Sequence, residues 1–450
     1  MTTSDSNVYG GGWIRDSTLV NNIRKAGRDI KYYSTFCKVY SDEAVRCDGL
    51  YFKLRDVLLA HNVPKYYDLP AFPEFESPFR NVSYAEKLSL GKFSMDSFNL
   101  ERFSKKIRSN FDMLVFQFIP RDVKEKKEYE ILRSLEFGAD GKLRREVMSF
   151  ENRLKKDNIR LLNTTSLLWS KVSSDIKENL GIIDVATIQG YDMIYSVYKD
   201  EYKKEIESLL RENVKNTDGF IGISEYYSRK ASSDLKIPLK KINVIYNGIN
   251  LEKYRPVDVK RDKRFIITFL GRMDIKKGGL NLIVAAKHLI DAGYTNFSVN
   301  IVGSIDRRDS EYIAILQNYI SLFKLSNVIE IKTDVTLDEK INILNKSDVL
   351  VYPTLFPEPF GLVPIEAMAC GTPVILPDHG AFPEIIRETK GGLLFRSNDT
   401  YDLAKKIIIL MESEDKRMEL SKDGLEAVRQ KFGAKLMADK VLKVYDDMLD

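Results

Sequence analysis

Two carboxylates, Glu358 and Glu366, stand eight residues apart in the stretch PEPFGLVPIEAMACGT, which covers residues 357–372. The stretch follows an apolar run at 348–353 and precedes a second one at 373–377, an order that predicts strand, loop, short helix and strand. Eight residues along an α-helix give an angular offset of roughly 80°, so one helical face would not present both carboxylates together. We therefore predict that Glu358 lies in the loop and that Glu366 lies one turn inside the helix.

The predicted helix begins near Gly361, and its start is suited to binding an anion. Pro364 fits the first helical turn, where a missing N–H group leaves no hydrogen bond unmade. The free N–H groups at such a start, aimed at the loop, suit a phosphate or a sugar diphosphate. An enzyme of nucleotide-sugar chemistry needs this arrangement. The alternative is a plain strand–helix unit, in which an acidic residue stabilises the helix start by about 1 kcal/mol or less.

Two cations, Arg272 and Lys277, stand five residues apart in LGRMDIKKG (270–278). This segment directly follows a predicted strand and leads into a predicted helix. Breaking the bond between a sugar and a phosphate leaves a nucleoside diphosphate with growing negative charge, which two cations and helix N–H groups can neutralise. Removing one such preorganised partner typically costs about 3–4 kcal/mol of transition-state stabilisation. The alternative is a pair of ordinary basic residues in a surface loop.

The elements that must position these residues alternate regularly from residue 264 onward. The expected strands are the apolar runs at 265–270, 297–303, 328–332, 348–353, 373–377 and 391–396. The expected helices lie at 278–293, near 310–325, at 338–346, after Gly361 and at 401–413, with a last helical region at 415–449. Repeated strand–helix units predict a parallel sheet covered on both faces, which is a Rossmann-like domain.

The N-terminal half repeats the strand signal less regularly. Strands are expected at 29–36, 112–118, 159–166, 185–190 and 218–224, and a helix is expected at 17–27 after three glycines. This order predicts a second Rossmann-like domain with inserts near 38–110 and 121–157. The segment 242–256 carries strand, turn and proline in succession and is the expected domain junction. The predicted division is therefore 1–250, 251–420 and a C-terminal helix at 421–450.

Length and composition favour a soluble protein of two domains. A chain of 450 residues is too long for one ordinary core, and 44% hydrophobic with 30% charged residues is typical of globular proteins. Three histidines exclude a histidine-rich metal site, and three cysteines without metal spacing indicate a reducing compartment. No apolar run approaches the ~20 residues of a membrane span, and MTTSDSNVYGGG lacks the apolar core of a secretory signal. We therefore expect a cytoplasmic protein.

The segment 348–386 resembles the donor-binding motif of the family-4 retaining glycosyltransferases, also described as glycosyl transferases group 1. The resemblance lies in Glu358 and Glu366 with seven residues between them, in the Phe-Gly-Leu that follows the first, and in the run EAMACGTPV. These enzymes have the α/β GT-B fold. The resemblance therefore implies two Rossmann-like domains whose parallel sheets face an interdomain cleft, with a C-terminal helix crossing back to the N-terminal domain. It covers nearly all of the C-terminal half and the N-terminal half in outline.

The resemblance also implies roles for side chains at a donor site. Arg272 and Lys277 would hold the donor diphosphate, Lys277 rather than Lys276 because a glycine follows it. Glu366 would accept hydrogen bonds from the ribose hydroxyl groups. Glu358 would contact the transferred sugar, either as a nucleophile or as a group that stabilises an oxocarbenium-like state.

Backbone groups complete the implied donor site. Three consecutive N–H groups would cradle the distal phosphate and sugar: those of Phe360, Gly361 and Leu362. Gly303, at the end of a predicted strand, would allow close approach of the nucleotide, although a tight turn without a ligand explains it equally well. Gly12, in the glycine loop 10–12, would meet the donor phosphate from the other side of the cleft or belong to a disordered terminus. The base would pack beside residues 332–334.

One position departs from the family pattern on the acceptor side. Family members usually carry a histidine at the end of an N-terminal-domain strand, whereas VATIQGYD (185–192) places Gln189 there. A glutamine donates and accepts hydrogen bonds but cannot carry a proton away, which excludes a histidine base at this position. In a retaining front-face mechanism the leaving phosphate can accept the proton of the acceptor instead. His379, where the family has a Gly-Gly turn, is expected to be a loop histidine.

These observations predict a retaining glycosyltransferase that moves a sugar from a nucleotide-sugar donor to a glycan, lipid or small-molecule acceptor. Neither an essential metal nor another cofactor is expected, and the net charge of +5 does not call for nucleic acid. Basic segments at 124–127, 142–147 and 229–241 suit either solvated helix faces or peripheral contact with an anionic membrane surface. Two alternatives remain. One is a nucleotide-sugar epimerase or phosphorylase of the same architecture. The other is a catalytically inactive nucleotide-sugar sensor or partner subunit, which Gln189 and the inserts suggest.

Overall fold

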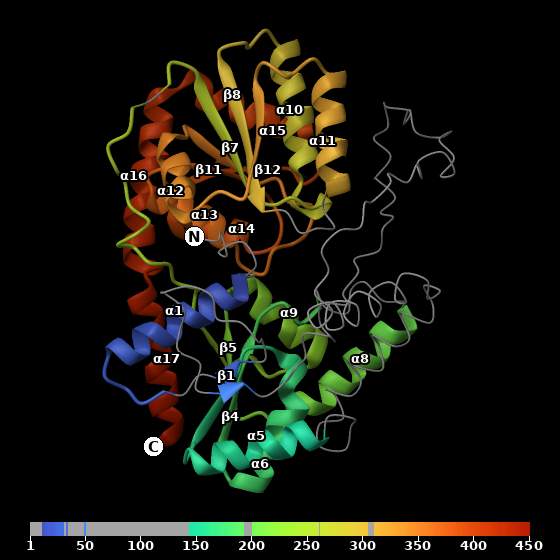
Figure 1. Ribbon diagram of the computed structural model, residues 1–450, viewed down its shortest axis with the longest axis vertical. Coiled ribbons are helices and arrows are strands. Elements are labelled where there is room, and N and C mark those ends of the chain that lie inside the picture. Colours follow the sequence, from blue (N-terminus) through green and yellow to red (C-terminus); the bar gives the residue numbers. More distant parts are fainter. Residues whose placement is uncertain are drawn as a thin grey trace, which may run out of the picture.

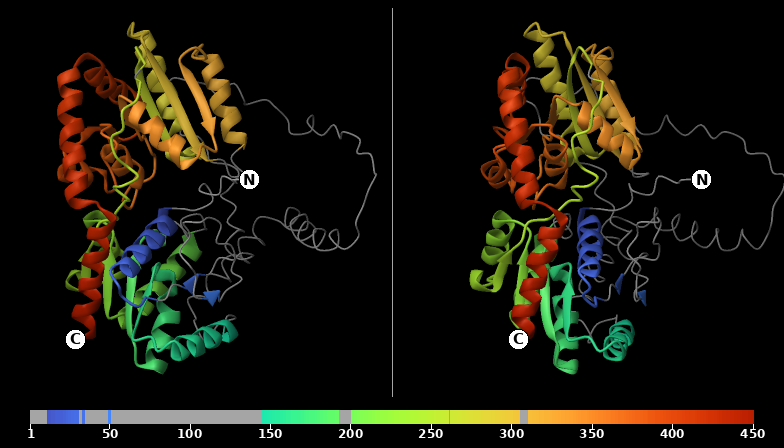
Figure 2. Two further views of the ribbon diagram at one scale, coloured as in Figure 1. Left: turned by 60° about the vertical axis from the view of Figure 1, so that its left-hand side comes forward. Right: turned by 90° about the vertical axis from the view of Figure 1, so that its left-hand side faces the viewer.

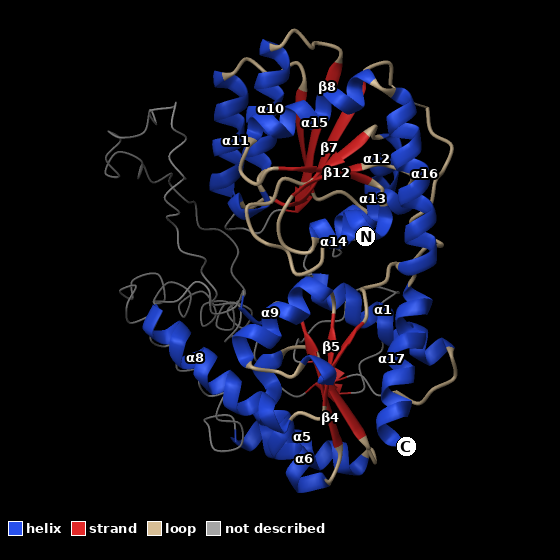
Figure 3. Cartoon of the chain, turned by 180° about the vertical axis from the view of Figure 1, so that it is seen from behind, coloured by secondary structure: helices blue, strands red, loops and turns tan. Residues whose placement is uncertain are grey.

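The computed structural model describes residues 11–30, 33–34, 49–50, 144–192, 200–260, 262–304 and 310–450. These residues form two α/β bodies, the N-terminal and C-terminal domains, which lie end to end in Figure 1. Each domain is a parallel sheet between helices (Figure 3). The predicted strand at 112–118 and most of both predicted inserts lie outside the described residues.

The C-terminal domain contains a six-stranded parallel sheet with the order β12-β11-β10-β7-β8-β9. Its strands are β7 (Phe265–Arg272), β8 (Phe297–Ser304), β9 (Ile329–Thr333), β10 (Val349–Val351), β11 (Val374–Pro377) and β12 (Gly392–Phe395). Its helices are η7 (Ile275–Lys277), α10 (Gly279–Asp291), α11 (Ser310–Leu322), α12 (Leu337–Lys346), α13 (Leu362–Ala369), α14 (Phe382–Thr389) and α15 (Thr400–Glu412). The predicted alternation of strands and helices is confirmed along this half of the chain.

Side chains of the C-terminal sheet alternate between its two faces and build a core on each. On β7, Ile267 and Phe269 join a core with α10, α11 and α15, whereas Leu270 joins a core with α12, α13 and α14. The second core continues into the N-terminal domain, where it includes Tyr191 and Tyr227. The two domains therefore share one apolar cluster.

The order of the strands creates a switch point at the centre of this sheet. The chain runs from β7 to β8 and β9 on one side, and then returns to β10 on the other side of β7. In parallel sheets of this kind, ligands bind in the crevice outside the carboxyl ends of the strands where the order reverses. The loops that follow β7 and β10 are those that carry Lys277 and Glu358.

The N-terminal domain contains a four-stranded parallel sheet with the order β3-β4-β5-β6. Its strands are β3 (Leu161–Thr164), β4 (Ile183–Ile188), β5 (Gly219–Gly222) and β6 (Ile242–Val244), and a separate pair is formed by β1 (Tyr33–Ser34) and β2 (Gly49–Leu50). Its helices are α1 (Gly11–Lys25), α5 (Arg144–Lys156), η4 (Leu167–Trp169), α6 (Ser170–Leu180), α8 (Asp200–Asn213), η5 (Val214–Asn216), α9 (Glu225–Leu235) and η6 (Leu239–Lys241). The helix predicted at 17–27 begins earlier, so Gly12 lies in the first turn of α1 rather than in a loop. The start of the helix was predicted wrongly because glycine lowers helix propensity and favours a loop prediction.

The C-terminal end of the chain connects the two domains. Helix α16 (Glu414–Lys431) packs on α13 and α14, whereas α17 (Ala434–Leu449) packs on α1 of the N-terminal domain (Figure 2). The crossover is tied to the interdomain segment, because the N–H group of Ile249 donates to Phe432 O at 2.9 Å and that of Ala434 donates to Ile249 O at 2.9 Å. The predicted return of the C-terminal helix is confirmed. Residue 420 falls inside α16, and the division at 250 and 420 stays a prediction.

One buried carboxyl group of the N-terminal sheet gives a testable dependence of stability on pH. Asp184 of β4 is fully buried, and burial raises its pKa from 3.8 to about 6, although a hydrogen bond from Thr217 Oγ1 (3.1 Å) opposes the rise. Because the folded protein holds this proton more tightly than the unfolded chain, the stability contribution of Asp184 falls as pH rises from about 4 to about 6. Between pH 4.5 and 7 the contribution falls by about 2 kcal/mol.

We expect Asp184→Asn to remove this part of the pH dependence while it preserves the volume of the side chain. Urea unfolding of both proteins at pH 4.5 and pH 7 measures the difference. The expected result is that the free energy of unfolding of the wild type falls between the two pH values by about 2 kcal/mol more than that of the variant. Equal changes in the two proteins would show that Asp184 titrates normally.

Candidate active site

The loops that follow β7 and β10 bring Lys277 and Glu358 together. Lys277 Nζ forms an ion pair with Glu358 Oε1, and the two side chains are only 12% and 11% exposed. The hydroxyl group of Tyr352 donates to the same carboxylate oxygen at 3.4 Å. Sequence analysis assigned Lys277 and Glu358 to one site, and the structure places them in direct contact at the switch point of the sheet.

Local backbone geometry fixes the position of Lys277. Asp274 caps η7 by accepting a hydrogen bond from the N–H group of Lys276 at 2.8 Å, and Gly278 ends the turn in the left-handed conformation (φ +76°). The carbonyl oxygen of Lys276 accepts hydrogen bonds from Thr354 Oγ1 at 2.8 Å and from the N–H group of Leu355 at 2.8 Å. The turn that carries Lys277 is therefore attached to the loop that carries Glu358.

The electrostatics of this pair keep Lys277 charged. Burial lowers the pKa of Lys277, but Tyr352 and Glu358 outweigh burial, and the pKa lies above its ordinary value. Burial raises the pKa of the Tyr352 phenol, and the nearby Glu358 carboxylate adds to the rise. The neighbouring Lys276 behaves oppositely, because burial and the positive charges of Arg272 and Lys277 lower its pKa. The site therefore presents a fixed positive charge beside a carboxylate and a neutral phenol.

Arg272 lies at the same edge of the sheet but does not join this pair. It is the last residue of β7, its side chain is 60% exposed, and it pairs with Asp274 Oδ2 at 3.2 Å. An exposed ion pair of this kind contributes at most about 1 kcal/mol to stability. The Arg272 side chain can therefore leave Asp274 at a small cost in free energy.

Glu366 lies one turn inside α13, as predicted, and its side chain is buried. Lys340 of α12 places its Nζ 2.6 Å from Glu366 Oε2, as an ion pair rather than as an aligned hydrogen bond. The same Nζ lies 5.3 Å from the centre of the Tyr254 ring, and burial together with the Glu366 carboxylate raises the pKa of Tyr254. Sequence analysis did not identify Lys340 or Tyr254 as part of this site. The sequence pattern that could have identified Lys340 is its position four residues before the buried Leu344. That spacing puts both residues on one face of the helix.

The start of α13 has the geometry that the sequence predicts for anion binding. Gly361 is the residue that precedes the helix, its φ is +104°, and a Cβ atom there would lie 2.6 Å from Phe382 Cε1. No side chain of the described residues caps this helix start. Phe360 is buried, and Leu362 is the first helical residue. The backbone N–H groups of the first turn are thus not used by a capping side chain.

Gly303 and Gln189, two other predicted site residues, lie at the carboxyl ends of strands in different domains. Gly303 is the second-last residue of β8, beside β7, and a Cβ atom there would lie 2.1 Å from Gly271 O, so close strand packing by itself requires glycine. Gln189 directly follows β4, at the carboxyl edge of the N-terminal sheet. The donor and acceptor roles of Gly303, Gly12 and Gln189 stay predictions.

His379 is held in the loop between β11 and α14. Its Nε2 lies 3.1 Å from Thr354 O, and burial lowers its pKa. Within the described part of the chain, no group of three or more His, Cys, Asp or Glu side chains could hold a metal ion. No helix among the described residues is long and apolar enough to cross a membrane.

Known proteins resemble the part of the chain that carries this site. The family model of glycosyl transferases group 1 matches residues 250–427. An uncharacterized glycosyltransferase of Methanocaldococcus jannaschii is 29% identical over 279 residues, which are 62% of this chain and 72% of that protein. The capsular polysaccharide biosynthesis glycosyltransferase CapM of Staphylococcus aureus is 27% identical, over 51% of this chain and 61% of its own length. A D-inositol 3-phosphate glycosyltransferase of Streptomyces bingchenggensis is 31% identical, but over only 37% of this chain and 39% of its own length.

Solved structures share the fold. Sucrose-phosphate synthase of Thermosynechococcus elongatus superposes with a TM-score of 0.59 at 22% identity, over 69% of this chain and 82% of that one. Anabaena HepE, solved in complex with UDP, superposes with a TM-score of 0.60 at 17% identity, over 69% of this chain and 84% of that one. These likenesses show the GT-B fold. The family match over residues 250–427 and the relatives named glycosyltransferases support an enzyme of the glycosyltransferase type.

Proposed function

We propose that this protein transfers a sugar from a nucleotide-sugar donor with retention of the anomeric configuration and without an essential metal. The observation that carries the proposal is the buried Lys277–Glu358 pair at the switch point of the C-terminal sheet, next to the uncapped start of α13. The cation suits the donor diphosphate, and the carboxylate suits the transferred sugar. The free N–H groups suit the distal phosphate.

Lys277 and Arg272 would stabilise the leaving nucleoside diphosphate. As the bond between sugar and phosphate breaks, negative charge grows on the phosphate oxygens, and fixed positive charge in a buried site stabilises that charge strongly. Lys277 is buried and stays charged, whereas Arg272 is exposed and pairs with Asp274. We therefore assign the larger share of this stabilisation to Lys277, and we place Arg272 at the outer side of the diphosphate.

Glu358 and Glu366 would act on different parts of the donor. Glu358, in the loop, would face the transferred sugar, as a nucleophile or as a stabiliser of positive charge. Glu366 would accept hydrogen bonds from the ribose, with the Lys340 ion pair at Oε2 holding the carboxylate in place. Lys340 is thus a supporting residue for the role of Glu366.

The acceptor side of the proposal centres on Gln189. Gln189 lies at the carboxyl edge of the N-terminal sheet and cannot serve as a base, so the leaving phosphate would take the proton of the acceptor hydroxyl group. Names of relatives include a capsular polysaccharide biosynthesis glycosyltransferase and a phosphatidyl-myo-inositol mannosyltransferase, which supports a carbohydrate or lipid-linked acceptor. Closure of the domains would exclude water from the donor. Peripheral contact with an anionic membrane through the basic segment 229–241 stays a prediction.

Thermal stabilisation by nucleotides tests the donor site without knowledge of the acceptor. The panel contains UDP-, GDP-, ADP-, TDP- and CMP-sugars, with UDP-glucose first because HepE was solved in complex with UDP. A ligand at about 100 times its dissociation constant stabilises the folded protein by about 2.7 kcal/mol, which corresponds to a rise in Tm of a few degrees. We expect one nucleotide class to give this rise in the wild type and in the surface variant Glu426→Ala.

The same rise should be lost in Glu366→Ala and reduced in Arg272→Ala. Loss in Glu366→Ala and a smaller rise in Arg272→Ala, with the full rise kept in Glu426→Ala, would support a donor site on the C-terminal domain. An absence of any shift with the full panel would overturn the proposed donor site. A shift that persists in Glu366→Ala would overturn its assignment to the ribose.

A further inference from the structure

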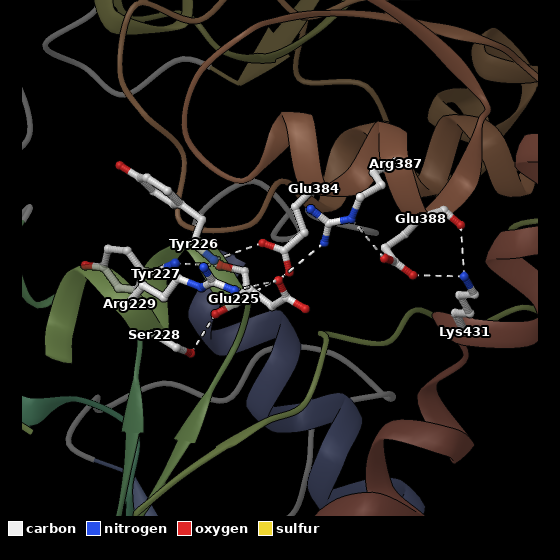
Figure 4. Close-up of polar contacts among 10 residues, drawn as sticks. Glu225, Tyr226, Tyr227, Ser228, Arg229, Glu384, Arg387, Glu388 and Lys431 are labelled. Atoms are coloured by element: carbon white, nitrogen blue, oxygen red, sulfur yellow. Dashed lines mark hydrogen bonds and ion pairs between the residues drawn. The ribbon is translucent and has the colours of Figure 1, made fainter. Parts of the chain in front are cut away.

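A buried glutamate joins the two domains at the start of α9 (Figure 4). Glu384 of α14 is 5% exposed and belongs to the C-terminal domain. Its Oε1 accepts a hydrogen bond from the N–H group of Glu225 at 2.8 Å, and its Oε2 accepts one from the N–H group of Tyr226 at 2.9 Å. Glu225 and Tyr226 are the first two residues of α9 in the N-terminal domain. One carboxylate therefore caps a helix of the opposite domain with both of its oxygens.

This contact has the electrostatics of a strong interaction. The N-terminus of a helix carries a partial positive charge, and a carboxylate there is stabilised by both the dipole and the free N–H groups. Glu384 also lies in the first turn of its own helix, α14, so the positive ends of two helices meet at one carboxylate. Burial raises the pKa of the Tyr246 phenol, and the adjacent Glu384 carboxylate raises it further. The Tyr246 side chain beside Glu384 is therefore neutral.

Two ion pairs with exposed basic side chains lie near Glu384. Arg387 Nη2 lies 3.4 Å from Glu225 Oε2, and Lys431 Nζ lies 2.9 Å from Glu388 Oε2 (Figure 4). Exposed pairs of this kind add little, because water screens them. Glu388, one turn after Glu384 on the same helix, is therefore a matched control that also carries a carboxylate near the boundary.

Helix α9 and α14 both hold the loop that carries Glu358. Ser224 Oγ, at the start of α9, donates to Pro359 O at 2.6 Å and accepts from the N–H group of Tyr227 at 3.0 Å. On the other side, the N–H group of Ala381, which precedes α14, donates to Glu358 O at 3.0 Å. Glu384 joins α9 to α14, so the loop lies within one closed set of hydrogen bonds that needs both domains.

We infer that Glu384 is a positioning residue, which couples closure of the two domains to the placement of Glu358. The inference rests on the proposed function, because it concerns the carboxylate that would face the transferred sugar. When the domains close, Glu384 accepts hydrogen bonds from the N-terminus of α9, and Ser224 then donates one to Pro359 O. When the domains open, these contacts are lost together, and the loop keeps only its contacts within the C-terminal domain. Glu384 itself does not touch the reacting atoms.

The test uses the full chain with Glu384→Gln, which keeps the volume but presents an N–H group where an acceptor is needed. Hydrogen exchange, resolved to single amides by fragmentation, reports directly on the N–H groups of Glu225 and Tyr226. We expect these two amides to exchange at least tenfold faster in E384Q, and within twofold of the wild type in the control Glu388→Gln. For turnover of the donor identified above, we expect kcat to fall at least tenfold in E384Q with KM for the donor changed less than threefold.

The outcomes separate this inference from the proposed function. Unchanged exchange at both amides in E384Q would overturn the inference, whether or not the protein is active. A raised KM with unchanged kcat would also overturn it, because Glu384 would then act on binding and not on placement. Should no nucleotide sugar bind the wild type, the proposed function would fail while the exchange result still decides whether Glu384 joins the domains. If E384Q does not fold, Glu384→Asp keeps the charge on a shorter side chain and is expected to show the same two effects at smaller size.

Discussion

Replacing Lys277 with alanine is expected to lower kcat/KM for sugar transfer by about 10²–10³-fold, which is the loss typical of one preorganised charge-stabilising group. The physical reason is that Lys277 is buried, charged and in contact with Glu358, so alanine removes a fixed positive charge from the site. Steady-state kinetics with the donor found by thermal stabilisation provide the measurement. The control is Lys276→Ala, which removes the neighbouring lysine from the same turn and is expected to change kcat/KM less than tenfold.

The same substitution is expected to destabilise the protein, and a second change distinguishes stability from catalysis. Without Lys277 the Glu358 carboxylate is left nearly buried and unpaired, a loss of about 3 kcal/mol in comparable cases. Adding Glu358→Gln removes the unpaired charge, so the double variant should recover much of the free energy of unfolding. It should not recover turnover. Recovery of both would show that Lys277 serves only to balance Glu358, and full activity in Lys277→Ala would contradict its role at the diphosphate.

The C-terminal domain was predictable because its strands carry an unusually plain signal. Strands of a parallel sheet are buried on both faces, so β7 and β11 read as nearly continuous apolar runs of the right length. The helix start at Gly361 was predictable for a different reason, since a proline in the first turn and a glycine before it mark the boundary locally.

The contact between Lys277 and Glu358 could be proposed from the family resemblance, whereas the pattern of residues alone does not predict it. The two residues are 81 positions apart, and they meet only because β10 returns to the side of β7. The order of strands in a sheet is a property of packing over the whole domain, and no local pattern encodes it. The same limit hid Lys340 beside Glu366, because their contact depends on how α12 and α13 face each other.

The interdomain role of Glu384 could not be predicted from the sequence, even from the family resemblance. Its partners are two backbone N–H groups, 159 and 158 residues away in the sequence, and a backbone group carries no signature in the residue types. In the stretch PDHGAFPE, the sequence pattern singles out His379 because histidine is rare in this chain. In the structure, Glu384 is the residue of this stretch that forms hydrogen bonds with α9 of the N-terminal domain. Residues that act through backbone partners in another domain are visible only once the domains are placed together.

Gly278→Ala is the second substitution for which we expect a large effect, on both stability and donor binding. Gly278 has φ +76°, and a Cβ atom there would lie 1.9 Å from Pro353 O and 2.7 Å from Pro353 C. An alanine must therefore push η7 away from the segment that leads to Glu358, and Lys277 is the residue directly before it. We expect a loss of about 3 kcal/mol or more in the free energy of unfolding, of which the left-handed conformation by itself accounts for about 1 kcal/mol.

Gly293→Ala separates the two contributions, because Gly293 also has a left-handed backbone (φ +90°) but a Cβ atom there meets nothing within 4 Å. It follows α10, the helix that Gly278 precedes, so the two variants probe opposite ends of one element. Urea unfolding should show about 1 kcal/mol for Gly293→Ala, and nucleotide binding should be unchanged in it. Folded Gly278→Ala should bind the nucleotide at least tenfold more weakly, because the position of Lys277 depends on that turn. Equal stability losses in the two variants would mean that the Pro353 contact relaxes freely, and normal nucleotide binding in Gly278→Ala would show that Lys277 does not need this turn to reach the diphosphate.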